Sequence, residues 1–150
     1  MKKVIIMLAL VASSFVMNAQ TRSVNLELLG SSGLAGVNYD ARFNGNSGFG
    51  YSVGLGYGFS AGTSVPTTHE LGIPVELNYL WGRNSSHFVL GAGAYAGISK
   101  AEKSDIQFGG NIFADIAYSY QRPTGFTFAI GVKPNLSKAF WPYISLGYSF

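Results

Sequence analysis

The chain is dominated by stretches in which bulky apolar residues alternate with small or polar ones. Over residues 49–59, every odd position is Phe, Tyr, Val or Leu, and every even position is Gly or Ser. A period of two indicates strands with one apolar face. The pattern predicts eight strands, at residues 23–30, 34–43, 49–60, 70–81, 87–98, 106–120, 126–135 and 140–150. We therefore expect an all-β fold.

The connections between these segments are expected to alternate in length. Three compact turns rich in Asn, Gly, Ser and Pro are predicted at Asn44–Gly48, Gly82–Ser86 and Gln121–Gly125. The opposite ends carry Ser31–Gly33, Ala61–His69, Ser99–Asp105 and Leu136–Lys138, of which two are clearly longer. Short turns at one end and longer loops at the other are typical of an antiparallel up-and-down transmembrane β-barrel.

The N-terminus differs from the rest of the chain. Lys2 and Lys3 precede the apolar run Val4–Met17, and a small residue, Ala19, follows at a plausible cleavage site. A membrane-spanning helix is the alternative, but it needs about 20 apolar residues, more than this run offers. We expect residues 1–19 to be a cleavable signal peptide that directs export across the inner membrane, and residues 20–150 to form the barrel domain.

Composition narrows the classes of protein further. Charged residues make up 11% of the chain, against about 25% in soluble domains. No cysteine is present, which excludes disulfides, thiolate metal sites, a cysteine nucleophile and a lipid-bearing cysteine. Without Lys2 and Lys3 the net charge falls from +3 to +1, with no basic cluster for nucleic acid. No cofactor or metal is implied.

The apolar faces are predicted to point outward. A soluble, lipocalin-like barrel would place them inside, but an eight-stranded barrel is only just wide enough for ordinary side chains. Outward aromatic residues also gather beside the short turns on every strand except the first, as an interfacial girdle requires. They are Phe43, Phe49, Tyr51, Tyr79, Trp81, Phe88, Tyr118, Tyr120, Phe126, Phe128, Tyr148 and Phe150.

The signal-like start, the eight alternating segments and the closing residues Gly147-Tyr148-Ser149-Phe150 resemble the small outer-membrane β-barrel domain family of Gram-negative-type bacteria. The resemblance implies an integral outer-membrane protein in contact with lipid and lipopolysaccharide. It also implies that the aromatic last strand is read by the barrel-assembly machinery. We expect a monomer.

Polar residues on the inward face are the candidate functional residues. They form a predicted lumenal network of Glu27, Asp40, Arg42, Glu76, Asn78, Asn111, Asp115 and Lys133. Buried charges need partners. The Gln121–Gly125 turn places Asp115 opposite Lys133 or one diagonal step away, and Glu27, Asp40 and Arg42 can meet across the first hairpin. The network predicts a structural or surface-interaction protein with a closed or very narrow lumen. A narrow porin-like channel for ions or small solutes is the alternative.

Catalysis is not predicted. The two histidines, His69 and His87, are expected at opposite ends of the barrel, so they cannot share a site. A lipid-modifying enzyme that uses His69 beside Thr67, Thr68 and Glu70 is a weaker alternative, because a Ser-His-acid site requires a defined geometry. In the loops, Lys100 and Lys103 are candidates for contact with lipopolysaccharide, although polar loops are expected in any barrel.

Overall fold

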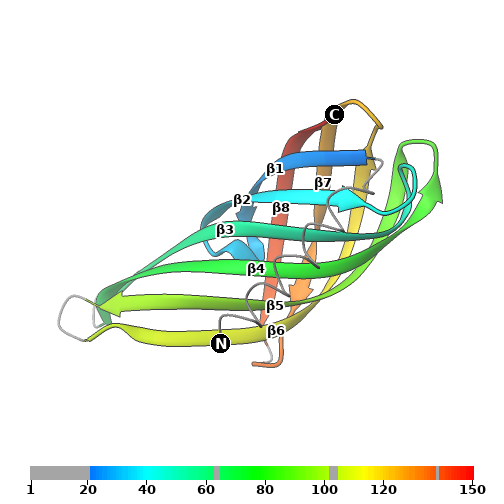
Figure 1. The fold of residues 1–150 in the computed structure, drawn as a ribbon. Helices are drawn as coiled ribbons and strands as arrows, with labels where there is room; N and C mark the ends of the chain where they lie inside the picture. The colour runs from blue at the N-terminus through cyan, green and yellow to red at the C-terminus, as the bar shows by residue number, and fades with distance from the viewer. Residues whose placement is uncertain (1–20, 63–64, 102–104, 138) are drawn as a thin grey trace, which may run out of the picture.

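Eight strands form a closed barrel in the computed structural model, which describes residues 21–62, 65–101, 105–137 and 139–150. Each strand pairs antiparallel with the next, and β1 pairs with β8 (Figure 1). The predicted eight-stranded antiparallel up-and-down barrel is therefore confirmed. The elements are β1 (Thr21–Leu29), the 3-10 turn η1 (Gly30–Ser32), β2 (Ala35–Arg42), β3 (Gly48–Gly62), β4 (Val65–Arg83), β5 (Ser86–Ala101), β6 (Gln107–Gln121), β7 (Gly125–Pro134) and β8 (Phe140–Ser149). The expected signal peptide lies outside the described residues.

The strands differ in length, and this corrects the expected loops. β3 to β6 contain 15 to 19 residues, whereas β1, β2, β7 and β8 contain 8 to 10. Figure 1 shows the four long strands running past the others at the loop end. The expected loop Ala61–His69 is mostly strand, because Phe59 pairs with His69 and Gly62 with Val65. Strand β5 likewise continues to Ala101. The polar residues of these two segments led to the expectation of loops. Backbone hydrogen bonding between strands does not depend on side-chain polarity.

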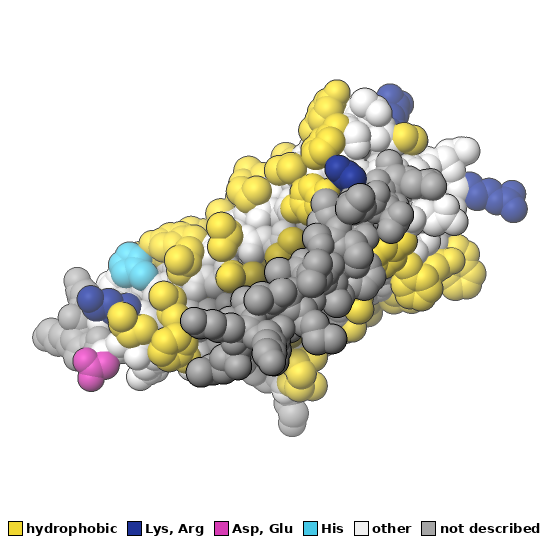
Figure 2. Space-filling view, in the orientation of Figure 1, with side chains coloured by type: hydrophobic (Ala, Val, Ile, Leu, Met, Phe, Trp, Pro, Cys, Tyr) yellow, Lys and Arg dark blue, Asp and Glu magenta, His cyan; other side chains and the backbone are white. Residues whose placement is uncertain are grey.

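The outer wall of the barrel is apolar along its length. On β4 the outward side chains run from Leu71 to Trp81, ten residue steps, and the other long strands carry matching runs. At about 3.3 Å per residue and a tilt of about 40°, ten steps give a height of about 25 Å. Figure 2 shows hydrophobic side chains along the part of this wall that is in view. The outer charged side chains of the described residues lie at the ends: Arg22, Arg83, Lys100, Asp105 and Arg122.

The predicted aromatic girdle lies at the turn end of this wall. Neighbouring strands bring rings together, with centroids 4.8 Å apart for Phe49 and Tyr79 and 5.7 Å apart for Phe43 and Tyr51. Eight of the residues are exposed: Phe49, Tyr79, Trp81, Phe88, Tyr118, Phe126, Tyr148 and Phe150. The other four are partly covered: Phe43, Tyr51, Tyr120 and Phe128. Among the described residues, no helix is long and apolar enough to cross a membrane.

Inward glycines make room for the large side chains of the lumen. A Cβ atom added at Gly72 would overlap the ring of Tyr95. One added at Gly91 would lie 2.6 Å from a carboxylate oxygen of Glu76, closer than real Cβ atoms approach other atoms. The glycine-rich inward face therefore allows one strand's bulky or charged side chain to lie over its neighbour's backbone.

Candidate functional site: the lumenal polar network

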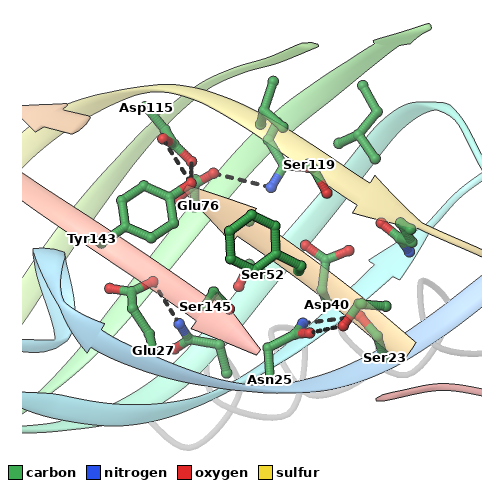
Figure 3. Close-up of a pocket in the computed structure, with 18 of the residues that line it drawn as sticks. Ser23, Asn25, Glu27, Asp40, Ser52, Glu76, Asp115, Ser119, Tyr143 and Ser145 are labelled. Atoms are coloured by element: carbon green, nitrogen blue, oxygen red, sulfur yellow. Dashed lines mark hydrogen bonds between the residues drawn. The ribbon is translucent and has the colours of Figure 1, made fainter. Parts of the chain in front are cut away.

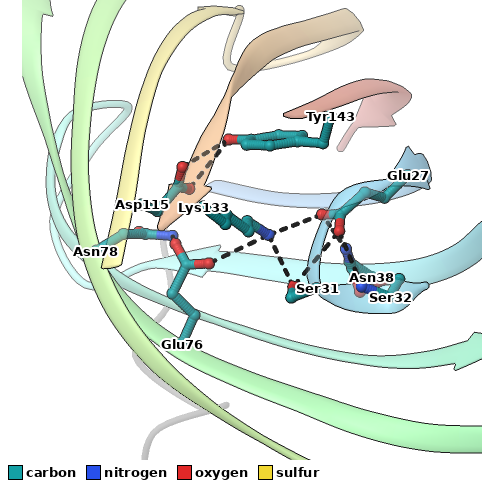
Figure 4. A network of polar contacts seen from close by, with 9 residues as sticks. All are labelled: Glu27, Ser31, Ser32, Asn38, Glu76, Asn78, Asp115, Lys133 and Tyr143. Atoms are coloured by element: carbon teal, nitrogen blue, oxygen red, sulfur yellow. Dashed lines mark hydrogen bonds and ion pairs between the residues drawn. The ribbon is translucent and has the colours of Figure 1, made fainter. Parts of the chain in front are cut away.

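Lys133 on β7 is the centre of the buried polar network (Figure 4). Its Nζ atom lies 2.9 Å from Oε2 of Glu27 and 3.4 Å from Oε2 of Glu76, and it donates a hydrogen bond of 3.1 Å to Oγ of Ser31. The ammonium also lies 4.5 Å from the ring centroid of Tyr143. Two carboxylates and an aromatic face therefore stabilise one buried positive charge.

Glu27 on β1 joins this centre to η1. Its Oε1 accepts a hydrogen bond from the backbone N–H of Ser32 at 3.2 Å, and its Oε2 accepts one from Nδ2 of Asn38 at 2.9 Å. Ser31 and Ser32 are almost fully buried. The expected Ser31–Gly33 connection does join β1 and β2 at the loop end, but its residues Ser31 and Ser32 fold into the lumen.

Backbone geometry explains this inward turn. Leu29, Gly30 and Gly33 have φ angles of 64°, 76° and 81°, in a region that favours glycine. Gly36 and Gly56, on the two adjacent strands, lack the Cβ atoms that would overlap Ser32. The chain can therefore reverse direction and place η1 above Glu27.

Asp115 has a different partner from Glu27 and Glu76. The β6–β7 pairing of Ile116 with Val132 sets Asp115 opposite Lys133, in the predicted register. Nevertheless, the ion pairs of Lys133 with described residues are those to Glu27 and Glu76. The Tyr143 hydroxyl lies 3.0 and 3.1 Å from the two carboxylate oxygens of Asp115 and donates to them.

Arg42 and Asp40 form a second pair, nearer the turn end. Nε of Arg42 donates to Oδ1 of Asp40 at 3.0 Å, and Nη1 donates to the carbonyl of Gly48 at 3.4 Å. The Arg42 side chain is fully buried. Both residues lie on β2, so this contact is within one strand and not across the first hairpin as predicted, and Glu27 contacts Lys133 instead of joining them.

The two predicted asparagines differ in their surroundings. Nδ2 of Asn78 donates to Glu76 at 3.0 Å, which makes Asn78 part of the network. Asn111 lies outside it, because its Nδ2 donates to Oγ of Ser137 near the loop end. The prediction missed Ser31, Ser32 and Tyr143. For Tyr143 the alternation of β8 was an available signal, because this residue falls on the inward face.

Two spaces lie on either side of this network. Toward the turn end is a cavity of about 70 Å³, lined by residues that include Asn25, Asp40, Ser119 and Gln121 (Figure 3). It is large and polar enough for water. Toward the loop end is a wider cup of about 530 Å³, to which Ser31 contributes. Glu27 and Lys133 line the smaller cavity, so the contacts between these residues and Ser31 lie between the two spaces.

The histidines do not contribute to this site. His69 faces outward, and its Nδ1 lies 2.6 Å from the hydroxyl of Tyr57. Glu70, the next residue, belongs to the inward face and lines the cup. His87 is buried near the turn end. Among the described residues, no group of three or more ligating side chains could hold a metal ion.

Known structures share this architecture. No protein-family model and no curated protein matches the sequence. The crystal structure of the N-terminal β-barrel domain of Pseudomonas aeruginosa OprF is similar with a TM-score of 0.61 and 11% identity, over 89% of this chain and 98% of that one. Ail, the attachment invasion locus protein of Yersinia pestis, solved with the heparin analogue sucrose octasulfate, gives a TM-score of 0.47 and 13% identity, over 87% and 95%. The eight strands of this chain thus form a β-barrel with a fold similar to that of the N-terminal domain of OprF.

Proposed function

We propose that this protein is an integral outer-membrane β-barrel with a structural or surface-interaction role and a lumen closed to ions. The observation that carries the proposal is the outer wall. A band about 25 Å high matches the apolar band of known transmembrane barrels. In water this wall would be an exposed apolar surface far larger than soluble monomers carry. In lipid the same wall is favourable, and the aromatic rings lie where an interfacial girdle is expected.

The closed lumen is supported by contacts at two depths. In the middle of the lumen, the side chain of Lys133 on β7 meets those of Glu27 on β1 and Glu76 on β4. At the turn end, Nδ2 of Asn46 donates to the backbone carbonyl of Gln121 at 2.8 Å, which joins two turns across the opening. An ion that crosses the barrel would have to displace both sets of contacts.

Planar-bilayer conductance of the refolded barrel tests this proposal. We expect no steady open-channel current from the wild-type protein, and none from the Lys100→Met control at the rim. Steady currents that change in Glu76→Gln would instead support the narrow channel, an alternative favoured by the polar lining of the 70 Å³ cavity. Recovery of the protein in the inner-membrane or soluble fraction of cells would contradict the proposed location.

The same proposal covers export, membrane insertion, the non-catalytic role and contact with lipopolysaccharide. The protein is exported by cleavage before Gln20, is inserted by the barrel-assembly machinery through its aromatic last strand, and functions as a non-catalytic monomer. At the loop end, Lys100 contacts lipopolysaccharide together with Lys103, which lies outside the described residues. Lipopolysaccharide binding that is unchanged in the Lys100→Ala, Lys103→Ala double variant would remove this contact from the proposal. Lipid hydrolysis abolished by His69→Ala would contradict the non-catalytic role.

A further inference from the structure

The cup at the loop end has the size and lining of a small-molecule site. Its volume of about 530 Å³ lies within the range of about 300–1,000 Å³ typical of ligand pockets. The longer strands β4, β5 and β6 form one side, with Glu70, Tyr95 and Asn111, and the shorter strands β1 and β8 form the other, with Leu29 and Trp141. Because η1 folds down into the lumen, this space is left open above the polar network.

The electrostatics of the cup favour a cation. Among the described residues that line it, Glu70 is the only charged one. None of the ion pairs between described residues includes Glu70. Tyr95 lies near its carboxylate, and a phenol group does not neutralise the charge. The carboxylate also lies beside Gly58, whose missing side chain keeps that part of the wall open.

Aromatic side chains line the cup together with Glu70. Trp141 is partly exposed in the cup, and the largely buried ring of Tyr95 lines it beside Gly72 and Gly97. Aromatic faces attract both apolar groups and organic cations. A carboxylate with no cationic partner among the described residues, combined with aromatic and aliphatic walls, is complementary to an ammonium group that carries an apolar body.

We propose that the cup binds small organic cations, such as primary amines with an aromatic or aliphatic body. Glu70 pairs with the ammonium group, and Tyr95 and Trp141 contact the apolar part. This function goes beyond the proposed sealed barrel and does not depend on it, because a barrel that conducts ions could carry the same cup.

Trp141 provides the readout for a binding experiment. The chain has two tryptophans, and Trp81 lies in the girdle at the opposite end, so the emission of Trp81→Phe reports on Trp141 alone. This variant, in nanodiscs of zwitterionic phosphatidylcholine, is titrated with phenethylamine, 2-phenylethanol and phenylacetate. These probes share one apolar body and differ in charge. We expect saturable changes in emission, with phenethylamine binding roughly three- to tenfold more tightly than the alcohol and phenylacetate most weakly.

A charge variant separates the site from partition into lipid. In Glu70→Gln on the Trp81→Phe background, the preference for phenethylamine should disappear while the alcohol still binds. His69→Gln, one residue away on the outward face, is the matched control and should keep the preference. Equal affinities for the three probes, emission that does not saturate, or a preference that survives in Glu70→Gln would each overturn the proposal. The ranking of probes needs no change at Glu70, so it is informative even if that variant does not fold.

Discussion

At the scale of single residues, Lys133 has the most demanding environment in the barrel. Its ammonium group is almost completely removed from water and is held by Glu27, Glu76 and Ser31. Removing a partner from a buried ion pair costs more than the pair itself contributes, because the remaining charges stay buried without compensation. Each member of this group therefore depends on the others.

The Lys133→Met variant tests this dependence. We expect the free energy of unfolding to fall by about 3–5 kcal/mol, since two carboxylates lose their shared cation. Urea unfolding of the refolded barrel in phosphatidylcholine vesicles, followed by tryptophan emission, measures the change. The exposed Lys100→Met should change stability by less than about 0.5 kcal/mol. If both variants unfolded alike, the lysine would not hold the network together.

At the scale of single residues, the inward glycines also affect the stability of the barrel. In Gly72→Ala the added methyl group overlaps the ring of Tyr95, and overpacking of this kind costs about 1–3 kcal/mol. Gly109→Ala, where an added Cβ atom would meet nothing within 4 Å, is the matched control and should be nearly neutral. The same unfolding assay compares them. Recovery of stability in Gly72→Ala, Tyr95→Leu would assign the loss to this contact, whereas an unrecovered loss would point to the backbone.

At the scale of elements, the extended β3–β4 hairpin replaces a predicted loop. His69 has backbone partners on both sides, Phe59 on β3 and Lys100 on β5. Such an amide is paired within the sheet and not exposed in a flexible segment.

Hydrogen exchange of the refolded protein distinguishes these two states. We expect the amides of His69 and Glu70 to exchange at least about tenfold more slowly than that of Thr124, in the β6–β7 turn, because paired strand amides must open before they exchange. Exchange of His69 as fast as that of Thr124 would mean that the hairpin is open at this point.

How well an element could be predicted depended on what holds it together. The alternation of Phe49 to Phe59 places β3 because burial on one face repeats every second residue. The inward fold of η1 was not predictable in this way, since it depends on positive φ angles at Leu29 and Gly30 and on space left by Gly36 and Gly56. Those conditions come from neighbouring strands and leave no periodic signal in the sequence.

At the scale of the whole molecule, the barrel reverses the usual distribution of side chains. Apolar residues face outward, and the described charged residues lie inside or at the two ends. This arrangement was predictable because bulky residues on every strand exceed the volume of an eight-stranded lumen. The partners of Lys133 were harder to predict. The register sets Asp115 opposite it, but the long lysine side chain reaches Glu27 and Glu76 across the lumen.

Arginine substitutions on the wall test the membrane-spanning band. Val75 lies near the middle of the outward run of β4, and Leu71 lies at its loop-side edge. We expect Val75→Arg to lower the free energy of unfolding in vesicles by about 2–4 kcal/mol and Leu71→Arg by about 0–1 kcal/mol, because the cost depends on depth. Equal costs at the two positions would be inconsistent with a bilayer centred on this band.

The contact between Lys133 and Glu27 also has a consequence for the order of assembly. The two residues are separated by 106 positions in the sequence, and they belong to strands that are joined through β8 and the β1–β8 seam. While that seam is open, the lysine lacks one of its two counterions and η1 has no lysine beneath it. The ion pair is therefore a marker of closure, and a chain trapped before the last strands meet would carry an incompletely neutralised cation inside an unfinished sheet.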